Sequence, residues 1–415
     1  MSSDFEQAKS RVCQSEGAYV PMRPLVSSWE QRKLGDIAHR ITRKNEGESD
    51  LPLTISAQYG LVDQRTFFNN QVASKDMSGY YLLRKGEFAY NKSTSGDSPW
   101  GAVKRLEKYE RGCVSTLYIC FGLDDAAPNF LVTYYETDRW YKTVQVIAAE
   151  GARNHGLLNI APDDFFDTVL KLPSSREEQE QIGALFRDLD NLITLHQRKY
   201  DKLCTVKKSM LDKMFPKPGE TEPEIRFEGF TDPWEQRKFS DMYVVNNERN
   251  ANCELGYDRT LSIATMTFNG GNGAADDSLS NYKVIRIGDI AFEGHTNKVH
   301  AYGRFVLNDA GDGLMSPRFS CLRPIVEQRY SFWKYYIPRE ESMRPILVNA
   351  TKSGTMMNEL VPDDLMRESI LVPCLAEQEV IGNSLSQLDH LITLHQRKLE
   401  LLRNIKKSLL DRMFV

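Results

Sequence analysis

One long segment of this chain occurs twice. The 38 residues from Glu178 to Phe215 and the 38 from Glu377 to Phe414 are identical at 23 aligned positions, and both contain the unbroken octet LITLHQRK. In each copy the apolar residues recur at steps of three and four, which is the period of an amphipathic helix. At ~1.5 Å per residue, such a helix is about 57 Å long. The chain is therefore predicted to be a duplicated unit with one long helix in each copy.

A second repeated motif marks where each unit begins. The sequence WEQRK occurs at Trp29–Lys33 and again at Trp234–Lys238. The segments between the two repeated motifs correspond only weakly. The aligned positions are Arg84, Gly86 and Ala89 with Arg286, Gly288 and Ala291, and the PDD triplet at 162–164 with that at 362–364. Two units that share their repeated segments but differ in the bodies between them are predicted to have two different targets and one common geometry of assembly.

The charge along each helix indicates how the two helices pair. Residues 176–191 include five acids and two bases, whereas residues 196–215 include six bases and two acids. The second copy repeats the trend, with three acids and no base in 376–390 and six bases and two acids in 395–414. Antiparallel packing places each acidic half beside the other basic half, so we expect antiparallel helices. Local complementarity to the helix dipole is the alternative origin of this pattern.

Helix start and stop signals divide the chain into five segments. Pro173 and Pro373 precede the helices, Ser175 and Glu178 form a capping box, and Pro216 ends the first helix. The predicted segments are an N-terminal arm (1–23), a first body (24–174), a central helix (175–216), a linker with the second body (217–374) and a distal helix (375–415). The predicted fold class is α+β: two α/β bodies separated by a pair of long antiparallel helices in a coiled coil, with an internal pseudo-twofold repeat.

Two histidines lie in the predicted seam between the helices. His196 and His395 are near the midpoints, so antiparallel packing is expected to bring them together at a pseudo-twofold axis. A polar residue in such a seam can fix register, and the alternative is an imidazole that reaches out to water. The residues expected to pair the helices are Leu189, Leu192, His196, Leu203, Leu388, Leu391, His395 and Leu402. This pairing predicts a dumbbell with a helical spacer, which matches a DNA site made of two separated half-sites.

Composition excludes several classes of protein. A net charge of −4 does not suit a protein that coats nucleic acid indiscriminately, so any polyanion contact is expected to be local. No apolar stretch approaches the ~18 residues of a membrane span, and the opening MSSDFEQAKSR lacks the apolar core of a signal peptide. We therefore expect a cytoplasmic protein with no membrane partner.

The cysteines and histidines show no metal-ligand spacing. Seven of each are scattered along the chain without a CxxC pair or an HExxH motif, so no bound metal is expected. The cysteines are expected to be reduced structural thiols, and Cys113 and Cys120, which lie in an apolar run, to be buried. The glycine-rich segment Asn269–Gly273 lacks the Lys and Ser/Thr of a phosphate-binding loop and is expected to be a flexible turn.

Several motifs together resemble the specificity (S) subunits of type I restriction-modification enzymes. They are WEQRK after GFTDPW (229–234), PDD ahead of a strand that ends in proline, EQ-x-x-IG at the start of a long helix, and LITLHQRK within that helix. The resemblance covers nearly the whole chain beyond residue 28. It departs from the family before Trp29, where the first unit has no GFTDPW counterpart and residues 1–23 match nothing in the second unit.

The resemblance implies a division of labour among subunits. Each body is a target recognition domain for one half of a bipartite sequence in double-stranded DNA, and the helices dock two modification (methyltransferase) subunits. Restriction subunits that hydrolyse ATP, translocate DNA and cleave it complete the complex. S-adenosylmethionine, ATP and Mg are then cofactors of the partner subunits, with none in this chain. The chain itself contains no GxxxxGK[ST] motif, no Asn-Pro-Pro-aromatic segment and no glycine-rich methyl-donor loop, so it is expected to be non-catalytic.

Base-reading residues are expected on loops with paired hydrogen-bond donors and acceptors. The candidates in the first body are Lys92, Ser93, Thr94, Arg153, Asn154 and His155, and those in the second are His295, Asn297, Lys298, Arg304, Lys352 and Ser353. The alternative for each is a solvated loop residue. Two other functions are weighed against DNA targeting: a stand-alone DNA methyltransferase or nuclease, and a coiled-coil adaptor without a DNA role.

Overall fold

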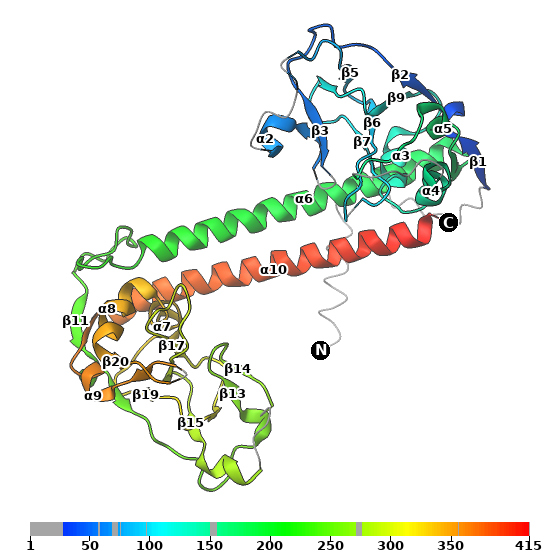
Figure 1. The fold of residues 1–415 in the computed structure, drawn as a ribbon. Helices are drawn as coiled ribbons and strands as arrows, with labels where there is room; N and C mark the ends of the chain where they lie inside the picture. Colours follow the sequence, from blue (N-terminus) through cyan, green and yellow to red (C-terminus); the bar gives the residue numbers. More distant parts are fainter. Residues whose placement is uncertain are drawn as a thin grey trace, which may run out of the picture. The chain divides into compact units, whose positions relative to one another are not determined.

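The computed structural model describes residues 28–56, 59–68, 74, 76–96, 98–149, 156–270, 276–355 and 357–414. The chain divides into two compact units: unit 1 comprises Met1–Thr194 with Glu400–Val415, and unit 2 comprises Leu195–Leu399. The two long helices are α6 (Arg176–Lys213) and α10 (Leu375–Met413), and each contributes one half to each unit (Figure 1). The predicted N-terminal arm lies outside the described residues.

Unit 1 is built around a four-stranded antiparallel sheet with the order β2-β9-β6-β7. Its strands are β2 (Ala38–Ile41), β6 (Phe88–Asn91), β7 (Ala102–Arg105) and β9 (Ile119–Leu123). Two-stranded pairs add β1 (Trp29–Lys33) with β10 (Val169–Pro173), β3 (Leu53–Ser56) with β4 (Gly60–Asp63), and β5 (Tyr81–Arg84) with β8 (Arg111–Val114). The helices are α2 (Gln64–Phe68), α3 (Pro128–Tyr134), α4 (Tyr141–Ala149) and α5 (Pro162–Phe166), with a 3-10 turn, η1 (Leu34–Asp36).

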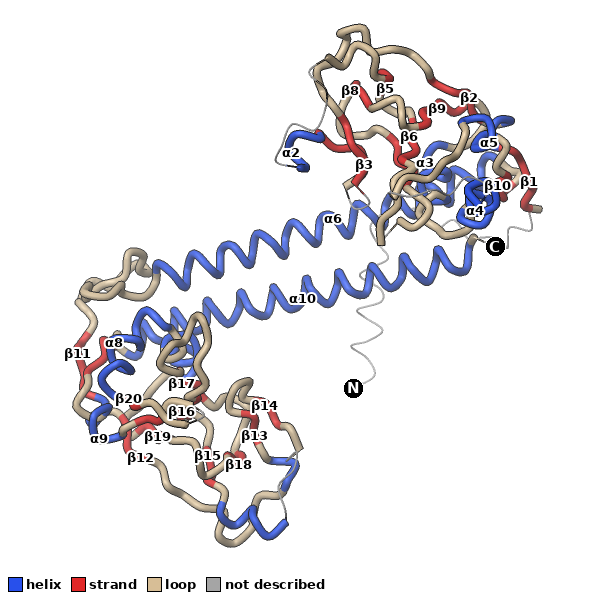
Figure 2. The backbone as a smooth tube through the Cα atoms, viewed as in Figure 1, coloured by secondary structure: helices blue, strands red, loops and turns tan. Residues whose placement is uncertain are grey.

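Unit 2 repeats this topology. Its four-stranded sheet has the order β12-β19-β16-β17, made of β12 (Tyr243–Val245), β16 (Ile290–Glu293), β17 (Arg304–Leu307) and β19 (Cys321–Pro324). The two-stranded pairs are β11 (Glu235–Lys238) with β22 (Ser369–Val372), β13 (Leu261–Ser262) with β14 (Thr267–Phe268), β15 (Lys283–Ile285) with β18 (Gly313–Met315), and β20 (Thr351–Lys352) with β21 (Glu359–Leu360). The helices are α7 (Tyr330–Tyr336), α8 (Glu340–Ala350) and α9 (Pro362–Leu365), with the 3-10 turns η2 (Phe239–Asp241), η3 (Tyr257–Arg259) and η4 (Asp276–Asn281). In both units the strands are short and loops connect them (Figure 2).

The weak sequence correspondences between the two bodies mark equivalent structural positions. Gly86 and Gly288 both have positive φ, +91° and +88°, in the turns that precede β6 and β16. The backbone N–H of Arg84 donates to Glu87 Oε2 at 2.7 Å, and that of Arg286 donates to Asp289 Oδ2 at 2.8 Å. The two PDD triplets begin α5 and α9, each with proline in the first turn, where its missing N–H costs nothing. The predicted internal repeat and α+β fold class are confirmed.

Each long helix ends inside the core of a unit. Phe414, after the end of α10, is 1% exposed in unit 1 and lies 5.7 Å from Trp29 and 5.5 Å from Phe130, measured between ring centroids. Phe215, after the end of α6, is also 1% exposed in unit 2 and stacks on Tyr336 at 5.3 Å. The repeated Met-Phe pair at the end of each copy therefore serves to anchor a helix end.

Near its beginning, each long helix has one glycine that lies so close to the body of its unit that no side chain would fit there. A Cβ added at Gly183 would lie 2.5 Å from the backbone N of Phe130, and a Cβ added at Gly382 would lie 2.6 Å from the backbone N of Phe332. Both glycines belong to the repeated EQ-x-x-IG motif, so the motif sets a close approach between the long helix and a short helix of the body.

The predicted burial of Cys113 and Cys120 is confirmed, because both thiols are free and at most 1% exposed. Burial raises the pKa of Cys113 to about 11 and that of Cys120 to about 12, as expected for inert structural thiols. In the part of the chain that the structure describes, no helix is both long and apolar enough to span a bilayer.

Candidate nucleic-acid interface

The first candidate loop of unit 1 lies beside the segment that follows the second candidate loop. Thr94 N–H donates to Gly156 O at 2.7 Å, and Lys92 Nζ donates to Ile160 O at 3.2 Å. Burial lowers the pKa of Lys92, whose amine is turned toward the protein. Arg153, Asn154 and His155 lie outside the described residues, immediately before this segment. The structure thus brings Lys92, Ser93 and Thr94 to the place where the second loop ends.

The two candidate loops of unit 2 also meet. Asn358 N–H donates to Gly294 O at 2.9 Å and its amide donates to Ala301 O at 3.3 Å, so the loop after β16 is tied to the β20–β21 hairpin. Lys352 and Ser353 are exposed on this hairpin, with Lys352 Nζ 3.5 Å from Glu359. The loop after β6 in unit 1 is therefore hydrogen-bonded to the segment between α4 and α5, and the loop after β16 in unit 2 to the segment between α8 and α9.

The remaining candidates of unit 2 differ in whether their side chains are exposed or already hydrogen-bonded within the unit. Asn297 Oδ1 accepts from the backbone N–H of Val299 at 2.8 Å and of His300 at 2.9 Å, so its oxygen is used within the loop. Lys298 is exposed. Arg304 is held by its own protein, because one guanidinium nitrogen donates to Ala264 O at 2.7 Å.

Sequence reasoning missed the carboxylate that organises this cluster. Glu293 is 5% exposed, and its Oε1 lies 2.6 Å from His295 Nδ1 while its Oε2 lies 3.6 Å from Arg304 Nε. The equivalent residue in unit 1 is Asn91, since each is the last residue of the third strand in the sheet order. The alignment of Arg84 with Arg286 already put these two positions in register, which was the available signal.

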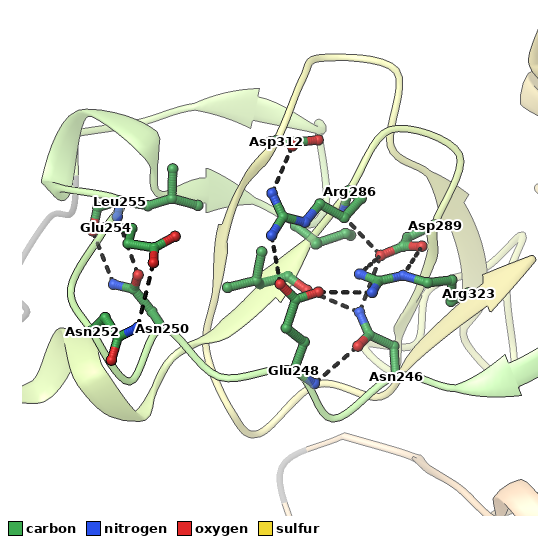
Figure 3. A network of polar contacts seen from close by, with 12 residues as sticks. Asn246, Glu248, Asn250, Asn252, Glu254, Leu255, Arg286, Asp289, Asp312 and Arg323 are labelled. Carbon is green, nitrogen blue, oxygen red and sulfur yellow. Dashed lines mark hydrogen bonds and ion pairs between the residues drawn. The ribbon is translucent and has the colours of Figure 1, made fainter.

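A network of ion pairs supports the sheet of unit 2 (Figure 3). Arg286 pairs with Glu248 at 2.6 Å and Asp312 at 2.8 Å, and Arg323 pairs with Asp289 at 2.9 Å and Glu248 at 2.7 Å. Burial acts to raise the pKa of Glu248, but hydrogen bonds from the two arginines outweigh it and leave that pKa below its ordinary value. Every member of the network is engaged inside the unit, so the network acts as a scaffold for the sheet.

Acidic and basic halves of the helices pair as the antiparallel arrangement requires. In unit 1, Lys406 of α10 lies 2.6 Å from Asp190 of α6 and 2.7 Å from Glu136. In unit 2, Lys207 of α6 lies 2.5 Å from Asp389 of α10. Lys207 and Lys406 are equivalent positions of the repeat, as are Asp190 and Asp389. Each helix therefore supplies the lysine in one unit and the aspartate in the other. Within each unit the beginning of one helix therefore lies along the end of the other.

The two histidines of the repeated octet contact each other in unit 2. His196 Nδ1 and His395 Nδ1 are 2.8 Å apart, so one ring donates a hydrogen bond and the other accepts it. Among the leucines expected to pair the helices, Leu189, Leu203, Leu388 and Leu402 are half-buried. Leu192 and Leu391 remain 44% and 40% exposed. Their place in the seam, like a role for the histidines in setting register, stays a prediction.

The histidine pair predicts a loss of stability in mild acid. Burial, together with His395, Lys398 and Lys199, lowers the pKa of His196. A histidine whose folded pKa lies below its ordinary value of about 6.5 stabilises the folded state above that pH and loses this contribution as pH falls through it. His196→Gln is expected to cost about 0.5–1.5 kcal/mol at pH 7.5, the usual worth of one hydrogen bond, and to flatten the pH dependence between pH 7.5 and 5.

Chemical denaturation of unit 2 at a series of pH values measures both effects. His390→Gln is the matched control, because His390 is exposed on α10, the helix that carries His395. If the His196→Gln and wild-type chains lose the same stability between pH 7.5 and 5, the pair does not act as described.

Among the described residues, no group of three or more His, Cys, Asp and Glu side chains is arranged to hold an ion.

Two units of the same topology, each with an antiparallel sheet, short helices and one half of each long helix, define a duplicated α+β protein. Solved structures of other proteins have a similar arrangement. The S subunit of a type I restriction-modification system from M. genitalium has a similar fold, with a TM-score of 0.54, 12% sequence identity, and coverage of 95% of this chain and 98% of that one. The chain therefore has the fold of the type I specificity subunits, as the motifs implied.

Two further structures are similar at lower scores. The HsdS subunit from Thermoanaerobacter tengcongensis matches with a TM-score of 0.44 and 18% identity over 95% of this chain and 98% of that one. A chain from a structural study of complex assembly and conformational transition in the type I R-M system matches with a TM-score of 0.45 and 16% identity over 95% and 99%. No protein-family model matches the sequence, and a search of curated proteins gives no match.

Proposed function

We propose that this chain is the DNA sequence-recognition subunit of a type I restriction-modification complex. The proposal rests on one observation. The two units have the same arrangement of strands and helices (the frame), including equivalent hydrogen bonds, whereas the loops on this frame differ. Asn45 in unit 1 and Asn250 in unit 2 illustrate the frame, since each is buried and accepts a backbone N–H from four or five residues ahead at 2.9 Å and 3.1 Å. Conserved frames with divergent loops suit two half-sites of different sequence.

The proposed mechanism is targeting without catalysis. Each unit binds one half-site of double-stranded DNA through its paired loops, and the antiparallel helices set the distance between the half-sites. Methyl transfer from S-adenosylmethionine, and ATP- and Mg-dependent translocation and cleavage, belong to the partner subunits. The stand-alone enzyme and the adaptor without a DNA role are less well supported, because neither accounts for two divergent loop pairs on one frame.

Exchanging one body tests this function. Replacing residues 29–174 with the corresponding body of another specificity subunit is expected to change one half of the methylated sequence and leave the other half intact. Sequencing methylated adenines in a genome that expresses the complex measures the result. A change in both halves, or in neither, would contradict independent reading by two units. Methyl transfer by the purified chain alone would instead support the stand-alone enzyme.

The repeated octet supports docking of two copies of one partner. Leu195 and Leu394 are equivalent leucines that stay 47% and 39% exposed, and each has an exposed lysine four residues later, Lys199 and Lys398. Residues at this spacing share one face of a helix. Packing among the described residues does not explain why both copies keep an exposed leucine. Two equivalent sites for two modification subunits do explain it.

Replacing both leucines with aspartate is expected to prevent assembly with the modification subunit without unfolding the chain. An exposed apolar anchor at an interface contributes about 2 kcal/mol or more, so the two changes should weaken binding at least tenfold. Calorimetry with the purified modification subunit measures this, and Leu401→Asp is the control because Leu401 is 59% exposed but has lysine at its equivalent position. Equal binding by all three chains would place the docking surface elsewhere.

A further inference from the structure

The two units differ in chemistry at one equivalent position of the candidate interface. In unit 1, Asn91 Oδ1 accepts a hydrogen bond from the backbone N–H of Ser93 at 3.0 Å. In unit 2, Glu293 Oε1 accepts the same bond from the backbone N–H of His295, also at 3.0 Å. The backbone turn is thus conserved between the units, while a neutral amide is replaced by a carboxylate.

Burial of this carboxylate requires compensation. The side chain of Glu293 is only 7% exposed, and a buried charge is stable only when it is paired and hydrogen-bonded. Arg304 supplies the opposite charge, with Nε 3.6 Å from Oε2. Since Glu293 offsets the charge of Arg304, and Arg304 also donates to Ala264 O, this cation has little attraction left for a phosphate.

The carboxylate also fixes the orientation of His295. A carboxylate only accepts hydrogen bonds, so the Nδ1 atom that lies 2.6 Å from Oε1 must carry the proton. In the neutral ring Nε2 is then an acceptor. The side chain is 63% exposed, so Nε2 is accessible on the loop that follows β16. A phosphate has no proton to donate to such an acceptor, whereas the exocyclic amines of adenine and cytosine do.

We propose that His295, held by Glu293, is a specificity-determining residue of unit 2 that accepts a hydrogen bond from the amino group of an adenine or cytosine in the major groove. The assignment rests on the proposed function of this chain as a DNA-recognition subunit. His295 contacts the base, and Glu293 is a positioning residue that selects the tautomer. Unit 1, with Asn91 and Ser93 at the equivalent place, reads its own half-site by different chemistry.

His295→Ala in the assembled complex with modification subunits tests the assignment. His295 accepts a single hydrogen bond, so preference at a single position in one half-site should fall roughly 2- to 13-fold. Sequencing of methylated sites gives the preference at each position. Glu293→Ala should relax the same position, because the ring loses its fixed orientation. Lys298→Ala, which removes an exposed cation, should weaken binding to all sequences alike, and His390→Ala on α10 should change nothing.

The outcomes separate this assignment from the proposed function. If the wild-type complex methylates no bipartite site, the proposed function fails. If the wild-type complex reads such a site but His295→Ala keeps every base preference, the assignment of His295 fails alone. Uniform weakening by His295→Ala with a smaller dependence of affinity on salt would indicate a phosphate contact and would also overturn it. Because His295 is exposed, its replacement leaves the fold intact.

Discussion

Replacing Phe414, the last described residue of the chain, with alanine is expected to destabilise the N-terminal body by about 3–5 kcal/mol. The ring is 1% exposed and lies among Trp29, Phe130, Tyr134 and Phe186, with centroid separations of 5.7, 5.5, 6.2 and 6.1 Å. Its removal leaves a cavity that these rings are too tightly placed to fill. The loss should appear as increased hydrogen exchange in peptides of unit 1, more than two hundred residues away in sequence.

Two controls make this result specific. Phe215→Ala removes the equivalent ring and should increase exchange in unit 2 instead, where Phe215 stacks on Tyr336. Leu401→Ala, at a 59% exposed position of the same helix, should change stability by no more than about 0.5 kcal/mol. If Phe414→Ala leaves exchange in unit 1 unchanged, the end of α10 does not form part of that core in solution.

Replacing Arg226 with alanine is expected to destabilise unit 2 by about 3–5 kcal/mol, because it leaves a buried carboxylate without its counter-charge. Glu377 is 1% exposed and accepts two hydrogen bonds from Arg226, at 2.9 Å from Nε and 2.8 Å from a terminal nitrogen. Such a bidentate pair is both strong and geometrically restrictive. It fixes the linker before β11 to the first turn of α10. Urea denaturation monitored by hydrogen exchange in unit 2 measures the loss.

A double variant separates the charge from the packing. With Arg226→Met and Glu377→Met together no buried charge remains, so most of the lost stability should return. If the double variant is as unstable as Arg226→Ala, the loss comes from packing around the linker. Arg367→Ala is a suitable control, because its ion pair with Asp364 is exposed at the end of α9 and is worth at most about 1 kcal/mol.

Identical residues of the repeat have different partners in the two units. Glu377 pairs with Arg226, whereas its counterpart Glu178 is hydrogen-bonded to Trp29, and burial raises the pKa of Glu178. The sequence alone suggested a capping role for Glu178. Ser175 Oγ does accept from the Glu178 N–H, at 3.4 Å, but the carboxylate is buried against the body. A capping motif concerns only neighbours along the chain, and the body that covers this turn comes from elsewhere in the sequence.

The sequence by itself determined the duplication, the two long helices and their antiparallel order. These follow from local properties: the period of apolar residues, the distribution of charge along one helix, and identity between two segments. The contact between His196 and His395 could be anticipated for the same reason, because two midpoints meet when helices of equal length pair antiparallel.

Only the tertiary structure decided the sheet order, the insertion of Phe414 and Phe215 into the two cores, and the pairing of Glu293 with His295 and Arg304. Strands of two to five residues carry too little periodicity to reveal their partners, which lie far apart in sequence. Whether a carboxylate is a solvated loop residue or a buried positioning group depends on the side chains that fold over it. Burial is a property of the folded unit and cannot be read from the order of residues along a loop.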